Sequence, residues 1–213
     1  MRRWLVGGAV LGGLTVAMTM GGGAETPSPL DQKVQSFLDR HEGTWHDLNV
    51  PEADGKVLYD LIVSKRFTRA LEIGTSTGRS TIWIAWALSK TGGKVTTLEI
   101  DPGRHAQALR NIEEAGLGPY VDARLGDAHQ LVRELPGPFD FVFSDADKGW
   151  YTRYFKDLEA KLSPGACFTA HNVLDGFAGV GQFLDYVKGR PGFTTRIERS
   201  SPSGVSISCR TLP

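Results

Sequence analysis

Residues 69–80 read RALEIGTSTGRS, and this stretch decides the fold class. It opens as a short apolar strand that ends in glycine, and apolar residues at helical spacing follow from Ser80. Between the two, Gly74 and Gly78 allow the backbone to approach a ligand closely, and the start of the helix offers free N–H groups. The stretch therefore predicts a strand, a ligand-binding loop and a helix.

The same alternation of strand and helix continues to the C-terminus, after two helices that are separated near Pro51. The last two strands are joined by the tight turn Pro202-Ser203-Gly204, so they form an antiparallel hairpin. We predict one α/β domain over residues 31–213, built on a doubly wound sheet of seven strands. The strands are expected at 69–74, 94–100, 121–125, 139–143, 165–170, 194–198 and 205–209, and the helices between them at 80–88, 101–112, 128–135, 151–162 and 180–188.

Charge and cysteine content exclude several classes of protein. Lys and Arg together number 24, as do Asp and Glu, so the net charge is zero and no nucleic-acid partner is expected. The two cysteines, Cys167 and Cys209, are too few for a disulfide scaffold or a Cys-rich zinc module. They lie in strands expected to be neighbours, and we predict two buried free thiols in preference to a disulfide.

The N-terminus has the layout of an export signal. Arg2 and Arg3 precede an uncharged, glycine-rich apolar run that is shorter than the roughly 20 residues of a membrane-spanning helix. We predict a signal peptide or N-terminal anchor over residues 1–24 and a linker over residues 25–30. The domain would then be exported or membrane-anchored, meeting a membrane only through this segment, or cytoplasmic if the start of the sequence is mis-assigned.

Acidic residues at two strand ends indicate the ligand. In open α/β sheets, ligands bind beyond the carboxyl ends of the strands. Glu72, just before Gly74, would repel a pyrophosphate but suits an ammonium group, and Glu99 at the end of the next strand can accept both hydroxyls of a ribose. The fingerprint G-x-G-x-x-G is absent, which disfavours a nicotinamide oxidoreductase. These features together predict S-adenosylmethionine (SAM).

Four segments carry a family resemblance: LEIGTSTGRSTIWIAWAL (71–88), TTLEIDP (96–102), LGDA (125–128) and FVFSDADKGWY (141–151). They resemble the SAM-dependent O-methyltransferases of the catechol and caffeoyl-CoA type. The resemblance implies the Rossmann-like fold of class I methyltransferases, a small hydroxylated acceptor such as an aromatic one, and a tendency to form homodimers. The residues it assigns to the cofactor are Glu72, Gly74, Ser76, Gly78, Ser80, Glu99, Ile100, Asp127, Ala128 and Asp145.

The same resemblance implies a metal at Asp145 and a base at Lys148, which removes the proton of the acceptor hydroxyl. A metal-bound hydroxyl has a lowered pKa, and a partly desolvated lysine can then take its proton. The family's Asp-Asn pair after the fifth strand reads His171-Asn172 here, which removes one negative charge. The set Asp145, His171 and Asn172 would then hold Mg, Mn, Zn or Fe, hold it weakly, or hold none, and in the last case His171 becomes a second candidate base.

Three further expectations concern the acceptor side. The turn at residues 199–204 lacks the acid that catechol enzymes carry there, and the glycine-rich segment 173–181 is a candidate lid. Trp150 and Tyr151 are interpreted either as an aromatic wall or as core residues.

The histidines without ligand spacing are predicted to lie on the surface: His41, His46, His105 and His129. The alternative function is an exported, non-catalytic protein that binds SAM or another small ligand on the same fold.

Overall fold

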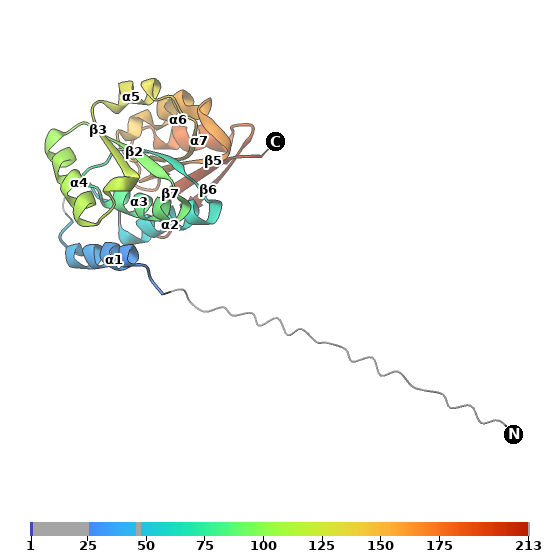
Figure 1. Cartoon of the computed structure of the whole chain (residues 1–213). Coiled ribbons are helices and arrows are strands. Elements are labelled where there is room, and N and C mark those ends of the chain that lie inside the picture. The colour runs from blue at the N-terminus through green and yellow to red at the C-terminus, as the bar shows by residue number, and fades with distance from the viewer. Residues whose placement is uncertain (2–25, 46–47, 213) are drawn as a thin grey trace.

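A seven-stranded sheet forms the centre of the computed structural model, which describes residue 1 and residues 26–45 and 48–212 (Figure 1). The strands are β1 (Arg69–Ile73), β2 (Lys94–Glu99), β3 (Val121–Leu125), β4 (Phe139–Ser144), β5 (Leu162–His171), β6 (Phe193–Glu198) and β7 (Val205–Arg210). Their order is β3-β2-β1-β4-β5-β7-β6, and β7 runs antiparallel to both β5 and β6. The predicted fold class and the C-terminal hairpin are therefore confirmed.

Seven helices cover the two faces of this sheet in the described part of the chain (Figure 1). They are α1 (Pro29–His41), α2 (Glu52–Lys65), α3 (Arg79–Thr91), α4 (Pro102–Glu114), α5 (Ala128–Glu134), α6 (Tyr151–Glu159) and α7 (Val180–Lys188), with short 3-10 turns η1 (Gly118–Tyr120) and η2 (Lys148–Trp150). Apolar residues of α1 to α4 form one core cluster, and those of α5 to α7 form the other. The sheet thus lies between two helical layers, which is the three-layer arrangement of a doubly wound fold.

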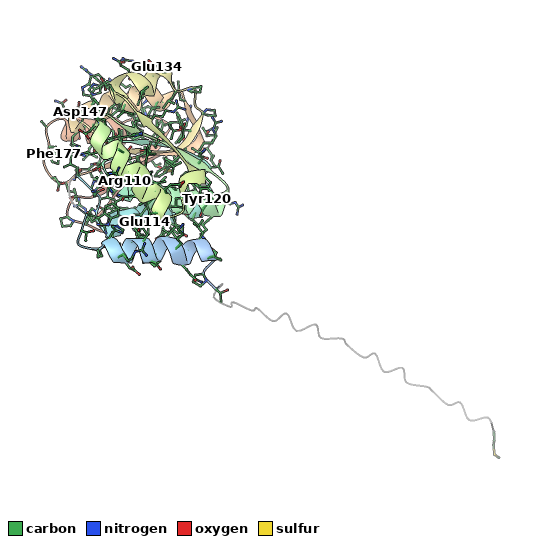
Figure 2. All side chains as sticks on the ribbon, turned by 60° about the vertical axis from the view of Figure 1, so that its left-hand side comes forward. Arg110, Glu114, Tyr120, Glu134, Asp147 and Phe177 are labelled. Atoms are coloured by element: carbon green, nitrogen blue, oxygen red, sulfur yellow. A yellow bond between two sulfur atoms is a disulfide. The ribbon has the colours of Figure 1, made fainter. Side chains whose placement is uncertain are left out.

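Local sequence explains where several helices begin. Asp101 caps α4 as predicted, because its side chain accepts a hydrogen bond from the backbone N–H of Arg104 at 2.7 Å. Ser28 caps α1 in the same way, so α1 begins at Pro29, inside the segment expected to be a linker. At its other end α1 lies beside α4, where Arg40 pairs with Glu114 at 2.9 Å (Figure 2).

The predicted N-terminal segment over residues 1–24 lies outside the described residues, apart from Met1, and so does His46. No helix in residues 26–45 or 48–212 combines the length and the apolar character needed to cross a membrane.

The helix expected over residues 80–88 continues to Thr91, and the boundary between the next-to-last predicted helix and the strand after it is wrong. The helix expected over residues 151–162 ends at Glu159, and β5 starts at Leu162 rather than at residue 165. Leu158 and Leu162 are four residues apart, which imitates the helical period. Leu162 instead pairs with Phe139 across the sheet, and the carbonyl of Lys161 accepts a hydrogen bond from the Phe139 N–H at 2.8 Å. Pairing with β4 therefore makes residues from Leu162 onward a strand, and this pairing cannot be recognised from the local sequence pattern.

The prediction of two free thiols is also wrong, because Cys167 and Cys209 form a disulfide. They are directly opposite each other on the antiparallel strands β5 and β7. This register brings the two Cβ atoms close enough for a bond. The disulfide joins the end of the chain to the central part of the sheet.

Removing this disulfide is expected to lower the free energy of unfolding by about 2–4 kcal/mol, because the bond closes a loop with a sequence separation of 42 residues and restricts the unfolded chain. Urea denaturation of the oxidised protein, of the dithiothreitol-reduced protein and of Cys209→Ser would measure it. The reduced protein and the variant should agree with each other. Equal stability of the oxidised and reduced forms would contradict the prediction.

Candidate functional site

The loops with polar residues converge where the order of the strands reverses. β1 and β4 are adjacent in the sheet although β2 and β3 lie between them in sequence, so their crossover connections leave on opposite faces. Such a reversal opens a crevice at the carboxyl ends of the strands. The loops after β1, β2, β3 and β4 all reach this edge, as the sequence predicted.

A cavity of about 240 Å³ lies in this crevice. Five of its lining residues were predicted to contact the cofactor: Gly74, Glu99, Ile100, Asp127 and Ala128. The others are Leu98, Gly126, His129, Ala146, Asp147 and Tyr154. The cavity therefore joins the ends of β1, β2, β3 and β4 in a single site.

The glycine loop needs Gly74 for a steric reason. Its φ is +100°, and a Cβ there would lie 3.0 Å from both the Cβ and the backbone N of Ala146. Any side chain at this position would thus strain the backbone and collide with the loop after β4. The missing side chain lets the two loops pack together at the floor of the cavity.

Glu99 holds the same loop to the end of β2. Its Oε2 accepts a hydrogen bond from the Ser76 N–H at 2.7 Å, and its Oε1 accepts from the N–H groups of Ile100 and Asp101 at 3.1 and 3.0 Å. A carboxylate oxygen can accept more than one hydrogen bond, so lone pairs remain for a ligand. Glu99 is thereby fixed at the cavity wall, and a ribose hydroxyl is a suitable partner.

Glu72 lies deeper, beneath the loop, and is completely buried. Its Oε2 accepts hydrogen bonds from Thr81 and Thr97 at 2.5 and 2.6 Å, whereas its Oε1 has no hydrogen-bond partner among the described residues. The hydroxyl of Ser76 is likewise buried and without a partner there. An unpartnered buried carboxylate oxygen and, four residues further along the chain, an unpartnered buried hydroxyl fit a ligand ammonium group, such as that of the methionine end of SAM.

The other predicted cofactor residues do not line the cavity. Gly78 is the N-cap of α3, where its φ of +98° suits glycine, and it packs against Ala108 of α4. Ser80 is buried in the first turn of α3. Both lie next to the loop, and their assignment to the cofactor remains a prediction.

Glu72 makes the stability of the cofactor-free protein depend on pH. Burial raises its pKa from 4.5 to about 7, against the hydrogen bonds that lower it. Between these two pH values the folded protein binds more protons than the unfolded chain, so its stability should fall as pH rises through this window, by about 3 kcal/mol in total.

Urea denaturation of wild type and Glu72→Gln at several pH values between 4.5 and 7 tests this. Glutamine does not titrate, so the variant should lose this part of the decline. If both proteins show the same pH dependence, the raised pKa of Glu72 is refuted.

Four charged side chains meet beside the cavity, at the ends of β4 and β5. Lys148 contacts the Oδ1 of Asp145 and donates to its backbone carbonyl at 2.6 Å. Nδ1 of His171 lies 3.3 Å from the Oδ2 of Asp145, and Nε2 lies 2.8 Å from the Oδ2 of Asp54. The structure thus brings together the predicted Asp145, Lys148 and His171, and it adds Asp54, which the sequence did not single out.

The predicted metal ligands do not fit a metal ion in this arrangement. Both ring nitrogens of His171 face carboxylates, and Lys148 places a positive charge on the carboxylate of Asp145. Asn172 points elsewhere, because its side-chain amide donates to Asp175 at 2.7 Å. Within residues 26–45 and 48–212, no group of three His, Cys, Asp or Glu side chains is arranged to hold a metal. We therefore derive no catalytic step through a metal.

Aromatic residues close one side of the cavity. The ring of His129 stacks on Trp150 with 3.5 Å between centroids, and its Nε2 lies 3.0 Å from Asp147. The expectation that His129 is a plain surface residue is therefore wrong: it is partly buried and lines the site. Because His129 directly follows Asp127 and Ala128, which were predicted to contact the cofactor, its sequence position could have indicated that it lies in the site. Tyr151, by contrast, is a core residue whose hydroxyl donates to the carbonyl of His171 at 3.0 Å.

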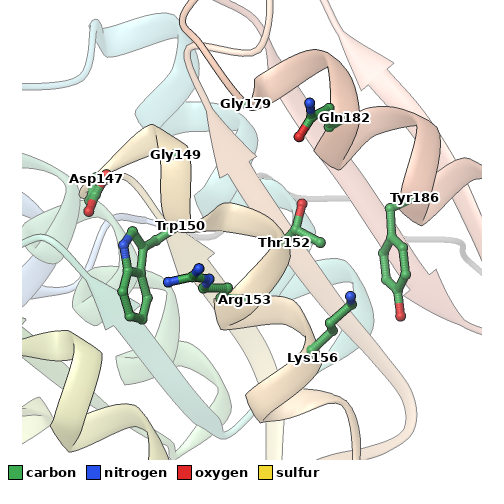
Figure 3. A pocket seen from close by; sticks show the side chains of 9 residues that line it. All are labelled: Asp147, Gly149, Trp150, Thr152, Arg153, Lys156, Gly179, Gln182 and Tyr186. Carbon is green, nitrogen blue, oxygen red and sulfur yellow. The ribbon is translucent and has the colours of Figure 1, made fainter.

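A second, more open hollow of about 670 Å³ lies outside this wall, between α6 and α7 (Figure 3). Arg153 lies over the ring of Trp150 at 4.6 Å, and Lys156 lies over the ring of Tyr186 at 4.9 Å. Gly179 of the candidate lid segment borders the hollow and packs against Gly149. Asp147 and Trp150 thus separate the hollow from the inner cavity, and Asp147 lines both.

Two curated proteins are similar to part of this chain. The catechol O-methyltransferase of Niastella koreensis is 44% identical over 131 residues, which cover 60% of this chain and 59% of that protein. The catechol O-methyltransferase of Mycobacterium tuberculosis is 38% identical over 129 residues, which cover 60% of this chain and 58% of that protein. The matched region thus spans about three fifths of the length of these relatives.

Solved structures match over more of their length. The O-methyltransferase from Bacillus cereus in complex with SAH has a TM-score of 0.74 at 27% identity, covering 85% of this chain and 91% of that one. The O-methyltransferase TomG from Streptomyces achromogenes in complex with SAM has a TM-score of 0.73 at 29% identity, covering 85% and 90%. The family model described as O-methyltransferase matches residues 24–180. The chain belongs to the O-methyltransferase family.

Proposed function

We propose that the protein transfers the methyl group of SAM to a hydroxyl of a small acceptor, with Lys148 as the base. The observation that carries this proposal is the Asp145–Lys148 pair at the end of β4. The next residues, Ala146 and Asp147, line the inner cavity, so the pair lies directly beside it. Two relatives of known structure that bind SAM or SAH support the choice of cofactor.

Bound SAM supplies an electrophilic methyl group on a sulfonium centre. Glu72 and Glu99 would hold its ammonium and ribose ends, since one has an unpartnered buried oxygen and the other lines the cavity. Lys148 first gives a proton to water, and its amine then accepts the proton of the acceptor hydroxyl at Nζ, because a hydroxyl is a weak nucleophile until this proton leaves. Asp145 then stabilises the resulting ammonium group, which returns the proton to water.

His171 is a weaker candidate for the base. Burial alone would lower its pKa, but the hydrogen bonds and negative charges of Asp145 and Asp54 outweigh burial and raise the pKa to about 9. The imidazole is therefore protonated at neutral pH and has no lone pair to accept another proton. Lys148 remains the proposed base because it stands at the position that the family resemblance assigns to the base and directly follows Asp147, which lines the inner cavity.

The acceptor we propose is a small hydroxylated aromatic molecule. The relatives named catechol and caffeoyl-CoA O-methyltransferase support this class. The turn at residues 199–204 carries no acid, and the hydroxyl of its Ser201 donates a hydrogen bond to Asp54 at 2.6 Å. We therefore expect the acceptor to be held by other groups than the acid that contacts a catechol in the family pattern.

For location, we propose export through the segment 1–24, or anchoring by it. The Cys167–Cys209 disulfide supports an oxidising compartment, because thiols stay reduced in the cytosol.

The test is incubation of the purified full chain with SAM and a panel of catechols, caffeoyl esters and monohydroxylated aromatics. Mass spectrometry should show the acceptor with one added methyl group and the demethylated cofactor in equal amounts. Saturating SAM binding with no methylated acceptor from any class would oppose the proposed reaction.

A further inference from the structure

Asp54 is a buried carboxylate that the reaction above does not use. It lies in the first turn of α2 and has no exposed surface. Its Oδ2 accepts hydrogen bonds from Nε2 of His171 at 2.8 Å and from Oγ of Ser201 at 2.6 Å. These two partners come from the end of β5 and from the turn between β6 and β7. A buried carboxylate is unfavourable without such partners, so the three segments depend on one another here.

The ring of His171 fills the space between Asp54 and Asp145. Its side chain is almost completely buried, with 4% exposed, and its two nitrogens lie 2.8 and 3.3 Å from the two carboxylates. Nε2 is engaged by the carboxylate of Asp54, and Nδ1 faces Asp145 without a hydrogen-bond partner among the described residues. The ring itself therefore occupies the space between the two carboxylates.

Lys148 and Asn172 also make the predicted metal position at Asp145 unsuitable for an ion. Lys148 brings a positive charge onto the other oxygen of Asp145, where a metal would otherwise neutralise the carboxylate. Asn172, the third member of the predicted set, is turned towards Asp175. Each carboxylate oxygen of Asp145 thus faces a nitrogen of a side chain of this chain.

We propose that the metal position implied by the family resemblance is closed in this chain: Lys148 and the Asp54–His171 pair take the place of the ion, and Asp54 is the positioning residue that holds His171 there. The inference rests on the proposed function for its meaning in catalysis, since methyl transfer would then proceed without a divalent metal. Its tests need no turnover, so failure of the proposed function would be seen separately.

The first test is calorimetric titration of the full chain with Mn²⁺ in the presence of SAM, for wild type and His171→Asp. Wild type is expected to bind no Mn²⁺ at millimolar concentration. The variant places three carboxylates together without the imidazole, so we expect it to bind Mn²⁺ at least about 100-fold more tightly, and Mn²⁺ should raise its melting temperature. Adding Asp145→Ala to the variant should abolish this binding.

Micromolar binding of Mn²⁺ to wild type that Asp145→Ala removes would overturn the proposal. A His171→Asp protein that folds and binds no Mn²⁺ would overturn the role of His171 in closing the position. If the variant fails to fold, the wild-type titration still decides whether the position is closed.

The second test examines Asp54 as the positioning residue with the same Mn²⁺ titration. Asp54→Ala removes the partner that holds the His171 ring, so we expect this variant to bind Mn²⁺ at millimolar concentration. Asp60→Ala, at an exposed position on the same helix, should bind none, like wild type. A folded Asp54→Ala protein that binds no Mn²⁺ would overturn the role of Asp54.

Discussion

Replacing Lys148 by alanine is expected to lower kcat for methyl transfer by about 10²–10⁴-fold, which is the usual contribution of a general base. Lys148 lies four residues after the end of β4, and its amine is held beside Asp145 at the edge of the inner cavity. Alanine removes the proton acceptor, and it leaves Glu72 and Glu99 in place. SAM affinity should therefore stay within about threefold of wild type, since the lost interaction belongs to the transition state.

Single-turnover rates with saturating SAM and a competent acceptor would measure this loss, with SAM affinity determined by calorimetry. Lys156→Ala is the matched control, because Lys156 is exposed on α6 and lines only the outer hollow. An unchanged rate in Lys148→Ala would exclude this residue as the base.

Replacing Glu99 by glutamine is expected to weaken SAM binding by about 3 kcal/mol, roughly 100-fold in Kd at 25 °C. The carboxylate would form charge-assisted hydrogen bonds with the ribose hydroxyls, and these are stronger than bonds to a neutral amide. Glutamine keeps an oxygen that can accept from the Ser76 N–H, so the glycine loop should keep its conformation. Its NH₂ group also places a donor where Glu99 accepts from the backbone of Ile100 and Asp101.

Calorimetric titration with SAM would measure the change, and circular dichroism would confirm that the variant is folded. Glu134→Gln makes the same chemical change at an exposed residue at the end of α5, far from the glycine loop in sequence, and should bind SAM like wild type (Figure 2). Wild-type affinity in Glu99→Gln would mean that the ribose is held by other groups.

Much of the inner cavity could be predicted because its signals are local. Gly74 and Glu99 lie at strand ends, and their neighbours in sequence already show a glycine loop and an acid that closes a strand. The cavity contains both residues, together with Ile100, Asp127 and Ala128. In a parallel sheet, residues at successive strand ends must meet at one edge, so sequence position alone brings them together.

The charged cluster beside the cavity could not be predicted in the same way. Asp54 and His171 are separated by 117 residues, and only the packing of α2 against the end of β5 places them 2.8 Å apart. The apolar periodicity of the sequence does not predict such a contact, because the contact depends on how the helical layer packs on the sheet. The same holds for His129, whose stacking on Trp150 requires α5 and η2 to meet.

The sequence by itself therefore determined the order of strands and helices, the glycine loop, the acids at the strand ends and the position of Asp145 and Lys148 just after the fourth strand. Apolar periodicity, glycine and capping residues act over a few residues, so the chain carries these features locally. The tertiary structure alone decided that Cys167 and Cys209 are bonded, that β5 begins at Leu162, and that His171 is held between two carboxylates. Each of these depends on strand register or on contact between layers, and neither is encoded in any single stretch of the chain.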